Sequence, residues 1–172
     1  MRVSDILDLI AGFDDAGVRY LVVGGLAVIA HGYIRATVDI DLVLDPDVAQ
    51  LERAVAVLDS LGYRPRVPVK LADFVSPEVR RRWRDDKDML AFTVIKGSGS
   101  SQSEVDLFLE SPFVFDEAYA AAMVQEHASG HLICFVDLRR LRDMKRAAGR
   151  PKDLLDLAEL AKIHGDGPDQ TS

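Results

Sequence analysis

The chain has 172 residues, 48% of them hydrophobic, and its 21 basic and 28 acidic residues give a net charge of −7. This length and apolar content suffice for one domain with a buried core, and the acidic balance argues against a broad nucleic-acid-binding surface, though not against a local basic groove. The only cysteine is Cys134, which excludes intramolecular disulfides and cysteine-rich zinc sites.

Targeting signals are missing from the sequence pattern. The first ten residues carry acidic side chains and no cleavage motif, and no stretch approaches eighteen apolar residues. We therefore expect a cytoplasmic protein with no membrane contact. We also expect one domain over residues 1–165, with a helical part at 138–164 and a polar tail at 166–172.

A first helix is predicted from an N-cap at Ser4 to a stop near Gly17. Its apolar residues Ile6, Leu7, Ile10 and Phe13 recur on one face. This helix is expected to cover a sheet, and we assign no chemistry to it.

Residues 20–44, YLVVGGLAVIAHGYIRATVDIDLVL, organise the rest of the chain. Residues 21–23 read as a buried strand that stops at Gly24 and Gly25, and residues 26–31 read as a short helix. Glycines at this junction let backbone N–H groups approach a ligand, and a helix N-terminus favours negative charge. The pattern predicts a phosphate site, whereas the simpler interpretation is a plain strand-to-helix turn.

Residues 38–44 predict a second strand, on which Asp39 and Asp41 share one face while Ile40 and Leu42 enter the core. Carboxylates two residues apart on a strand lie roughly 6–7 Å apart. At an effective dielectric near 20 their repulsion is on the order of 2–3 kcal/mol. A hard divalent cation relieves this repulsion. The alternative is a solvated strand face.

Gly24-Gly25, with Arg35 and Thr37 upstream of Asp39 and Asp41, resembles the signature of the nucleotidyltransferase superfold. More narrowly, residues 24–42 resemble the AbiEii-type branch of bacterial toxin-like nucleotidyltransferases. The resemblance implies an α/β (α+β) fold, a mixed β-sheet flanked by helices with further C-terminal helices. It also implies two divalent ions, Mg²⁺ or alternatively Mn²⁺, and a third carboxylate. Many active members have Gly-Ser where this chain has Gly-Gly, which removes one side-chain ligand.

The middle of the chain is expected to support the sheet. Asp45 is the predicted N-cap of a helix that stops at Gly62, and residues 63–69, with two prolines, predict an irregular edge strand. A helix starting at Ser76 carries arginines 80, 81, 82 and 84. These arginines either line a route for a triphosphate or an RNA, or form a solvated face with internal ion pairs.

A hairpin is predicted from residues 89–95 and 104–109, joined by a polar connection at 97–103. The resemblance assigns the third carboxylate to Asp106. Glu104 shares its face and competes for the role. Asp106 is preferred because apolar residues flank it on both sides.

Residues 115–124 predict a helix and residues 131–136 a short strand. We interpret His127 and His131 as structural or exposed, because Gly130 between them disfavours helical metal ligation. His31 is read as structural, with ligand contact as the alternative.

The C-terminal segment LRDMKRAAGRPKDLLDLAEL also resembles the family, in which a helix with a lysine precedes a turn with arginine, lysine and aspartate. This resemblance places Lys145 at the nucleotide phosphates, with help from Arg150 or Lys152. The alternative is a pair of helices with solvated cations, whose leucines 154, 155, 157 and 160 pack inward.

Eight residues are assigned to the site. Asp39, Asp41 and Asp106 are the catalytic and metal-binding residues, and the nucleotide-binding residues are Gly24, Gly25, Arg35, Thr37 and Lys145. Arg35 has the alternative of pairing with Asp39 or Asp41.

These assignments predict an Mg²⁺-dependent enzyme that moves NMP from an NTP to a hydroxyl of an RNA, a protein or a small molecule. A toxin with a cognate antitoxin is one form of this function. A non-catalytic nucleotide- or partner-binding module is the alternative, and a plain structural domain is a third possibility.

Overall fold

The computed structural model describes residues 3–99 and 102–165, and within them seven strands form one mixed sheet with the order β3-β4-β5-β2-β1-β7-β6. The strands are β1 (Tyr20–Val23), β2 (Asp39–Leu44), β3 (Arg64–Pro65), β4 (Ala91–Lys96), β5 (Ser103–Phe108), β6 (Met123–Glu126) and β7 (Leu132–Phe135). The predicted mixed sheet flanked by helices is confirmed, and the proline-containing strand β3 lies at its edge.

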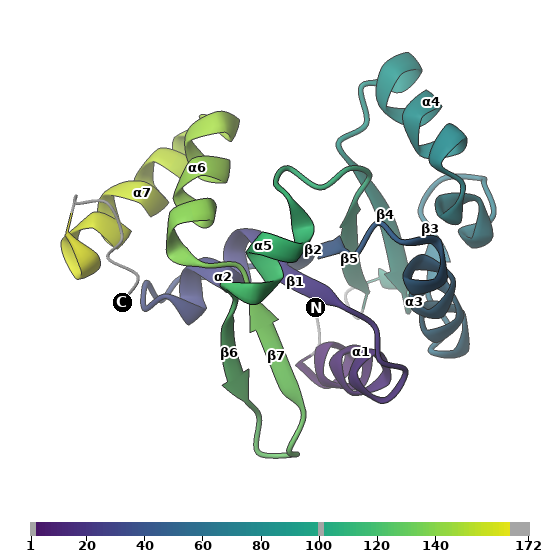
Figure 1. Ribbon diagram of the computed structural model, residues 1–172, viewed down its shortest axis with the longest axis horizontal. Coiled ribbons are helices and arrows are strands. Elements are labelled where there is room, and N and C mark those ends of the chain that lie inside the picture. The colour runs from purple at the N-terminus through teal and green to yellow at the C-terminus, as the bar shows by residue number, and fades with distance from the viewer. Residues whose placement is uncertain (1–2, 100–101, 166–172) are drawn as a thin grey trace.

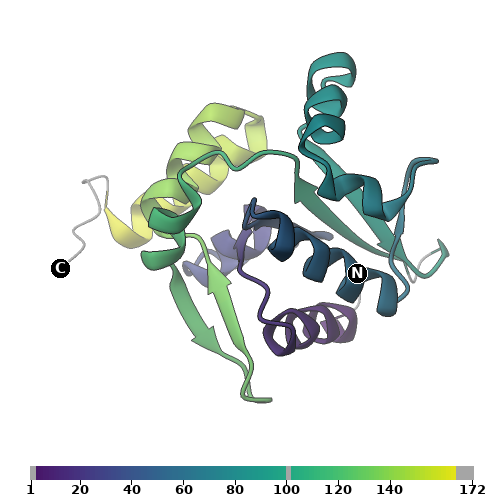
Figure 2. The same ribbon diagram turned by 45° about the vertical axis from the view of Figure 1, so that its right-hand side comes forward.

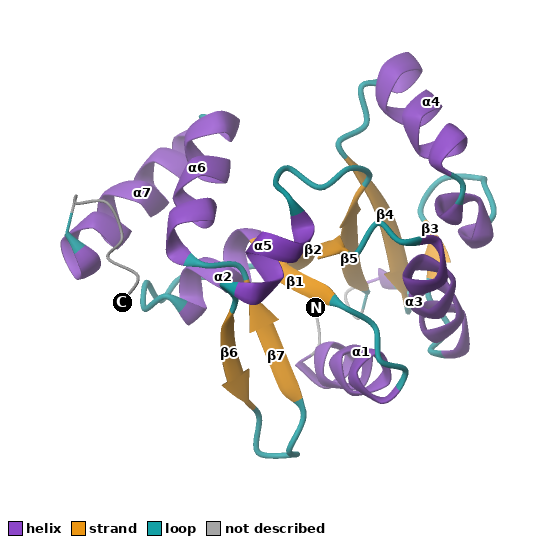
Figure 3. Cartoon of the chain, viewed as in Figure 1, coloured by secondary structure: helices purple, strands orange, loops and turns teal. Residues whose placement is uncertain are grey.

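The helices surround this sheet (Figure 1, Figure 3). They are α1 (Val3–Asp15), α2 (Gly24–Ala30), α3 (Val48–Ser60), the 3₁₀ helix η1 (Leu71–Val75), α4 (Pro77–Lys87), α5 (Phe115–Ala120), α6 (Leu138–Ala148) and α7 (Pro151–His164). Helices α6 and α7 pack as a pair at one end of the molecule, and α4 stands at the other end in both views (Figure 1, Figure 2). None of the helices in the described ranges is long and apolar enough to cross a lipid bilayer.

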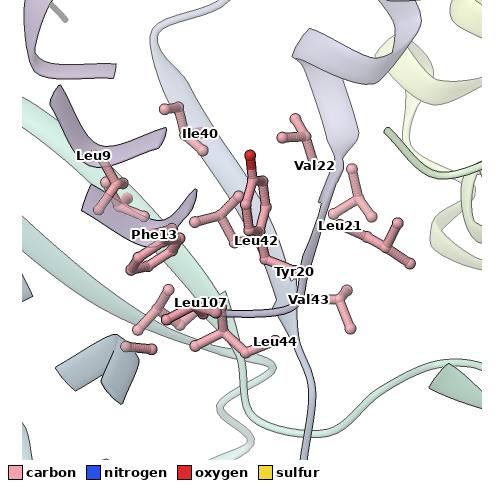
Figure 4. Packing of buried hydrophobic residues seen from close by; sticks show 14 of the residues in the cluster. Leu9, Phe13, Tyr20, Leu21, Val22, Ile40, Leu42, Val43, Leu44 and Leu107 are labelled. Carbon is pink, nitrogen blue, oxygen red and sulfur yellow. The ribbon is translucent and has the colours of Figure 1, made fainter. Parts of the chain in front are cut away.

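The core explains why the strands alternate as they do. Ile40 and Leu42 of β2 are almost fully buried together with Leu107 of β5 and with Leu9 and Phe13 of α1 (Figure 4). Burying each such side chain contributes about 1.5–3 kcal/mol. Because side chains on a strand alternate, this burial turns the acidic residues of β2 and β5 to the opposite face.

Strand pairing fixes the register of those acidic residues. Strand β2 runs parallel to β5, with Asp41 opposite Asp106 and Asp39 opposite Glu104. Strand β1 is antiparallel to β2, and β4 is antiparallel to β5, which confirms the predicted hairpin.

The start of α3 differs from the prediction. The N-cap is Asp47, whose carboxylate accepts hydrogen bonds from the backbone N–H groups of Ala49 and Gln50. Asp45 instead forms a 2.8 Å ion pair with Arg19. The N-cap prediction at Asp45 was wrong because its carboxylate is engaged by the neighbouring Arg19 and by the backbone N–H of Asp47, and Asp47 caps the first turn.

The predicted helix at 115–124 is too long. Helix α5 ends at Ala120, and residues 123–126 form β6, which is antiparallel to β7. No local pattern marks residues 123–126 as the outer partner of β7, so a tertiary pairing overrode the helical pattern. The predicted polar tail at 166–172 lies outside the described residues.

Candidate active site

The turn after β1 brings backbone and carboxylate into direct contact. Gly24 has φ +61°, and a Cβ atom built on it would lie 1.9 Å from Oδ2 of Asp41. The backbone N–H of Gly25 donates a hydrogen bond to the same carboxylate. Only glycine fits at position 24, because a side chain there would be strained and would displace Asp41.

At position 25 a glycine is favoured because a side chain would meet other residues. A Cβ on Gly25 would lie 2.4 Å from Oγ1 of Thr37 and 3.2 Å from Nη2 of Arg35. The Thr37 hydroxyl in turn donates to Oδ1 of Asp39 over 3.2 Å. The structure thus brings together six of the predicted site residues around one turn.

The third predicted carboxylate lies on the neighbouring parallel strand. Asp106 is in register with Asp41, and adjacent strands are about 5 Å apart. The hydroxyl of Thr93 on β4 donates to Asp106 over 2.6 Å. Its competitor Glu104 is instead engaged in a 2.9 Å ion pair with Arg66. This arrangement favours Asp106 over Glu104.

Proximity and burial perturb these carboxylates. Burial, followed by the charges of Asp39 and Asp106, raises the pKa of Asp41 to about 6. Burial also raises the pKa of Asp106, with further contributions from the charges of Asp39 and Glu104 and an opposing contribution from the Thr93 hydrogen bond. The charge of Asp39 thus contributes to both shifts, and the charge of Asp106 contributes to the shift at Asp41.

The donor set has the chemistry of a site for a hard cation. Mg²⁺ prefers carboxylate oxygens, and mutually repelling carboxylates are stabilised by a divalent ion. Within residues 3–99 and 102–165 no three acidic, histidine or cysteine side chains already converge as a ligand cage. In this structure Thr37, Gly25 and Thr93 each hold one of the three aspartates by a hydrogen bond.

A buried ion cluster joins the C-terminal helices to this site. Nζ of Lys145 on α6 lies 2.8 Å from both Asp153 and Asp156 of α7. Asp156 also accepts two hydrogen bonds from Arg35, of 2.7 and 3.0 Å, and Asp153 accepts one of 2.6 Å from Arg150. Both aspartates are essentially fully buried.

This cluster decides the questions that the sequence left open about the cations. Arg35 pairs with Asp156 and not with Asp39 or Asp41. Lys145 is buried rather than solvated, and its positive charge partly offsets the rise in the pKa of Asp41. The charges of Asp39 and Asp41 contribute to raising the pKa of Arg150, after its hydrogen bond with Asp153.

Helix α7 turns its aspartates inward, and not all of its leucines as the alternative predicted. Asp153 and Asp156 point inward, whereas Leu154 and Leu155 are 56% and 52% exposed. Leu160 is buried as expected. The expectation of inward leucines was wrong at positions 154 and 155, because the two aspartates neutralise Lys145 and Arg35 inside the fold.

The arginine run on α4 lines a crevice of about 200 Å³ beyond the ends of β2 and β5. Arg80 donates to the carbonyls of Phe74 and Val75, and Arg84 pairs with Asp85 and Glu110. These contacts agree with the interpretation of a face with internal ion pairs.

The histidines lie apart from the three aspartates. His31 is buried, with Nε2 2.8 Å from the carbonyl oxygen of Val136. His131 is 3.1 Å from Asp14, and His127 contacts Ser129. These contacts agree with a structural interpretation.

Sequence reasoning missed three side chains at the site. Thr93 lies opposite Asp106 in the hairpin, and no local pattern marks it. Asp153 and Asp156 lie near the start of α7, where acidic residues are ordinarily explained by the helix dipole. Their spacing of three places them on one helical face, and that face could have been matched to the preceding lysine.

No family model matches the sequence, and no curated protein matches it. Among solved structures, the lincomycin-bound lincosamide antibiotic adenylyltransferase LnuA is similar with a TM-score of 0.58 and 14% identity, covering 95% of this chain and 98% of that chain. ANT(2″)-Ia, in complex with adenylyl-2″-tobramycin, is similar with a TM-score of 0.56 and 15% identity, covering 93% of this chain and 87% of that chain. The chain has the nucleotidyltransferase fold.

A solution structure of the antibiotic-resistance factor ANT(2″)-Ia agrees, with a TM-score of 0.54, 16% identity and coverage of 93% of this chain and 82% of that chain. At these identities the similarity establishes the fold. It does not distinguish the AbiEii-type branch from other branches with the nucleotidyltransferase fold.

Proposed function

We propose that the protein is a metal-dependent nucleotidyltransferase that moves NMP from an NTP to an acceptor hydroxyl. The observation that carries this proposal is the coupled group of Asp39, Asp41 and Asp106, which faces the turn at Gly24 and Gly25. Carboxylates grouped on the face of a central sheet destabilise the fold, and binding of a positively charged ligand to them offsets this cost.

The residues have distinct roles in this proposal. Asp39 and Asp41 would hold one Mg²⁺, and together with Asp106 they would hold a second. Bound Mg²⁺ neutralises triphosphate charge and lowers the pKa of the acceptor hydroxyl. Arg35, which lies beside Gly25, and Lys145, whose charge acts on Asp41, would supply positive charge to the phosphates.

The reaction balances as a displacement at the α-phosphorus. The acceptor oxygen forms a bond to that atom, the bond to the bridging oxygen breaks, and pyrophosphate leaves while the hydroxyl proton passes to solvent. The protein contributes position and charge, because these govern phosphoryl transfer more than covalent chemistry does.

A small hydroxylated molecule is the acceptor we favour. One structural neighbour has lincomycin bound, and another is in complex with adenylyl-2″-tobramycin. The structural similarity extends over most of each chain. The crevice beside α4 is lined by Phe108, which shares a sheet face with Asp106, two residues earlier. This position suits an acceptor that approaches from the side opposite α6 and α7. An RNA or protein acceptor, as in an AbiEii-like toxin with its antitoxin, is tested in parallel.

The test is calorimetric titration of each NTP, in its non-hydrolysable form, with and without Mg²⁺. Wild type is expected to bind in an Mg²⁺-dependent manner, and a variant with Asp39→Asn and Asp41→Asn is expected not to bind. Asp86→Asn, which removes one exposed charge on α4, is the matched control.

Transfer is then measured from α-labelled NTP to small hydroxylated antibiotics, to RNA and to proteins. No Mg²⁺-dependent binding by wild type would refute the proposal. Binding without transfer to any acceptor class would favour the non-catalytic module.

A further inference from the structure

The segment that leads into β2 turns its polar side chains inward. Between α2 and β2, Arg35 and Thr37 are partly buried, whereas Ile34 and Val38 are 86% and 73% exposed. The residues before β2 thus follow the same alternation as the strand itself, with Arg35 and Thr37 on the face that carries Asp39. Exposing two large apolar side chains costs stability, so the inward positions of Arg35 and Thr37 need an explanation other than packing.

Thr37 occupies a defined space. Its Oγ1 lies 2.4 Å, and its Cβ 3.0 Å, from the point where a side chain at position 25 would begin. A side chain at position 25 therefore requires the Thr37 hydroxyl to rotate away or the backbone to shift. The hydroxyl of Thr37 thus occupies space directly beside the point where a side chain at position 25 would begin.

The same hydroxyl is aimed at the first carboxylate. It donates to Oδ1 of Asp39, the first residue of β2. Among the described residues, Thr37 is the side chain that hydrogen-bonds this carboxylate. A hydrogen bond is directional, so this contact favours one rotation of the Asp39 carboxylate.

We propose that Thr37 is a positioning residue of this site. Its hydroxyl replaces the side chain missing at Gly25 and orients Asp39 toward the divalent ion that the proposed function requires. The Gly24-Gly25 sequence is then compensated from position 37 rather than deficient in a ligand. This inference rests on the proposed function for its ligand, while its steric part concerns the protein alone.

The experiment is a mutant cycle between positions 25 and 37. Thr37→Val keeps the shape and removes the hydroxyl, and it is expected to weaken Mg²⁺-dependent NTP-analogue binding by about 10-fold or more. Thr37→Ser keeps the hydroxyl and is expected to bind within a few-fold of wild type. Val38→Thr is the matched control, since it makes the reverse change on the outward face.

Gly25→Ser alone is expected to lower both the melting temperature and the affinity, because of the 2.4 Å contact. Adding Thr37→Ala removes that contact and leaves one hydroxyl, so the double variant is expected to recover most of both losses.

The outcomes separate the two proposals. If wild type binds but Thr37→Val binds equally well, or if the double variant is no better than Gly25→Ser, the inference is overturned. If wild type does not bind, the proposed function fails, while the melting temperatures still report whether positions 25 and 37 exclude one another. If Thr37→Val does not fold, loss of binding by folded Thr37→Ser would overturn the inference instead.

Discussion

The coupled carboxylates make a prediction about stability that needs no substrate. Burial and the charges of Asp39 and Asp106 raise the pKa of Asp41 from its ordinary 3.8 to about 6. The folded protein therefore holds the Asp41 proton more tightly than the unfolded chain does. Between pH 4 and 6 the unfolded chain loses this proton first, so the contribution of Asp41 to stability falls as the pH rises through this window.

The magnitude follows from the size of the pKa difference. Each pKa unit corresponds to about 1.4 kcal/mol, so ionised Asp41 destabilises the fold by about 3 kcal/mol above pH 6. Asp41→Asn keeps the shape and removes the charge. We expect it to raise the free energy of unfolding of the metal-free protein by about 2–3 kcal/mol at pH 8 and by almost nothing at pH 4.

Urea unfolding in EDTA at pH 4, 6 and 8 measures this difference, with Asp86→Asn as the exposed control. Excess Mg²⁺ is expected to stabilise wild type at pH 8 and to leave Asp41→Asn little changed. The reasoning would be refuted if Asp41→Asn were no more stable than wild type at pH 8. It would also be refuted if the gain were equally large at pH 4.

Four further substitutions test the parts of the site separately. Gly24→Ala is expected to lower the free energy of unfolding by more than about 2 kcal/mol, as measured by thermal unfolding. The reason is that position 24 has a left-handed backbone conformation and its Cβ would collide with the Asp41 carboxylate. Asp106→Asn is expected to lower the rate of NMP transfer on the order of 100-fold or more, whereas Glu104→Gln changes it by only a few-fold; similar losses in both would remove the preference for Asp106. Lys145→Met leaves two buried aspartates without their shared cation and is expected to cost about 3–5 kcal/mol in urea unfolding, so an unchanged midpoint would contradict the ion cluster.

The elements that the sequence predicted correctly are those with local signals. The strand that stops at Gly24, the helix that follows and the alternation from Asp39 onward each follow from a few adjacent residues. The hairpin was also predictable, since its strands are close in sequence. Pairing of β2 with β5 was not encoded locally, and it was the family resemblance that placed Asp106 beside Asp41.

The failures at Asp45 and at residues 121–126 share a physical cause. Asp45 has the side chain of a good N-cap, yet Arg19 at the start of the neighbouring strand binds it, and the cap is Asp47. Residues 123–126 carry a weak helical pattern, yet β7 offers them a strand partner. In each case an interaction between distant segments outweighed a local preference of about 1 kcal/mol.

The C-terminal helix shows most clearly how function departs from the usual hydrophobic pattern. By apolar spacing alone, Leu154 and Leu155 should be inside and Asp153 and Asp156 outside, but the structure reverses them. The reason is Arg35, which lies 121 residues earlier than Asp156 and is anchored by it next to the Gly25 turn. The two buried aspartates instead hold Lys145, Arg35 and Arg150 close enough to the acidic residues of β2 for their charges to act on one another. Three cations share two aspartates, so the cluster keeps a net positive charge beside carboxylates that repel one another, an arrangement that suits the metal-bound triphosphate of the proposed function.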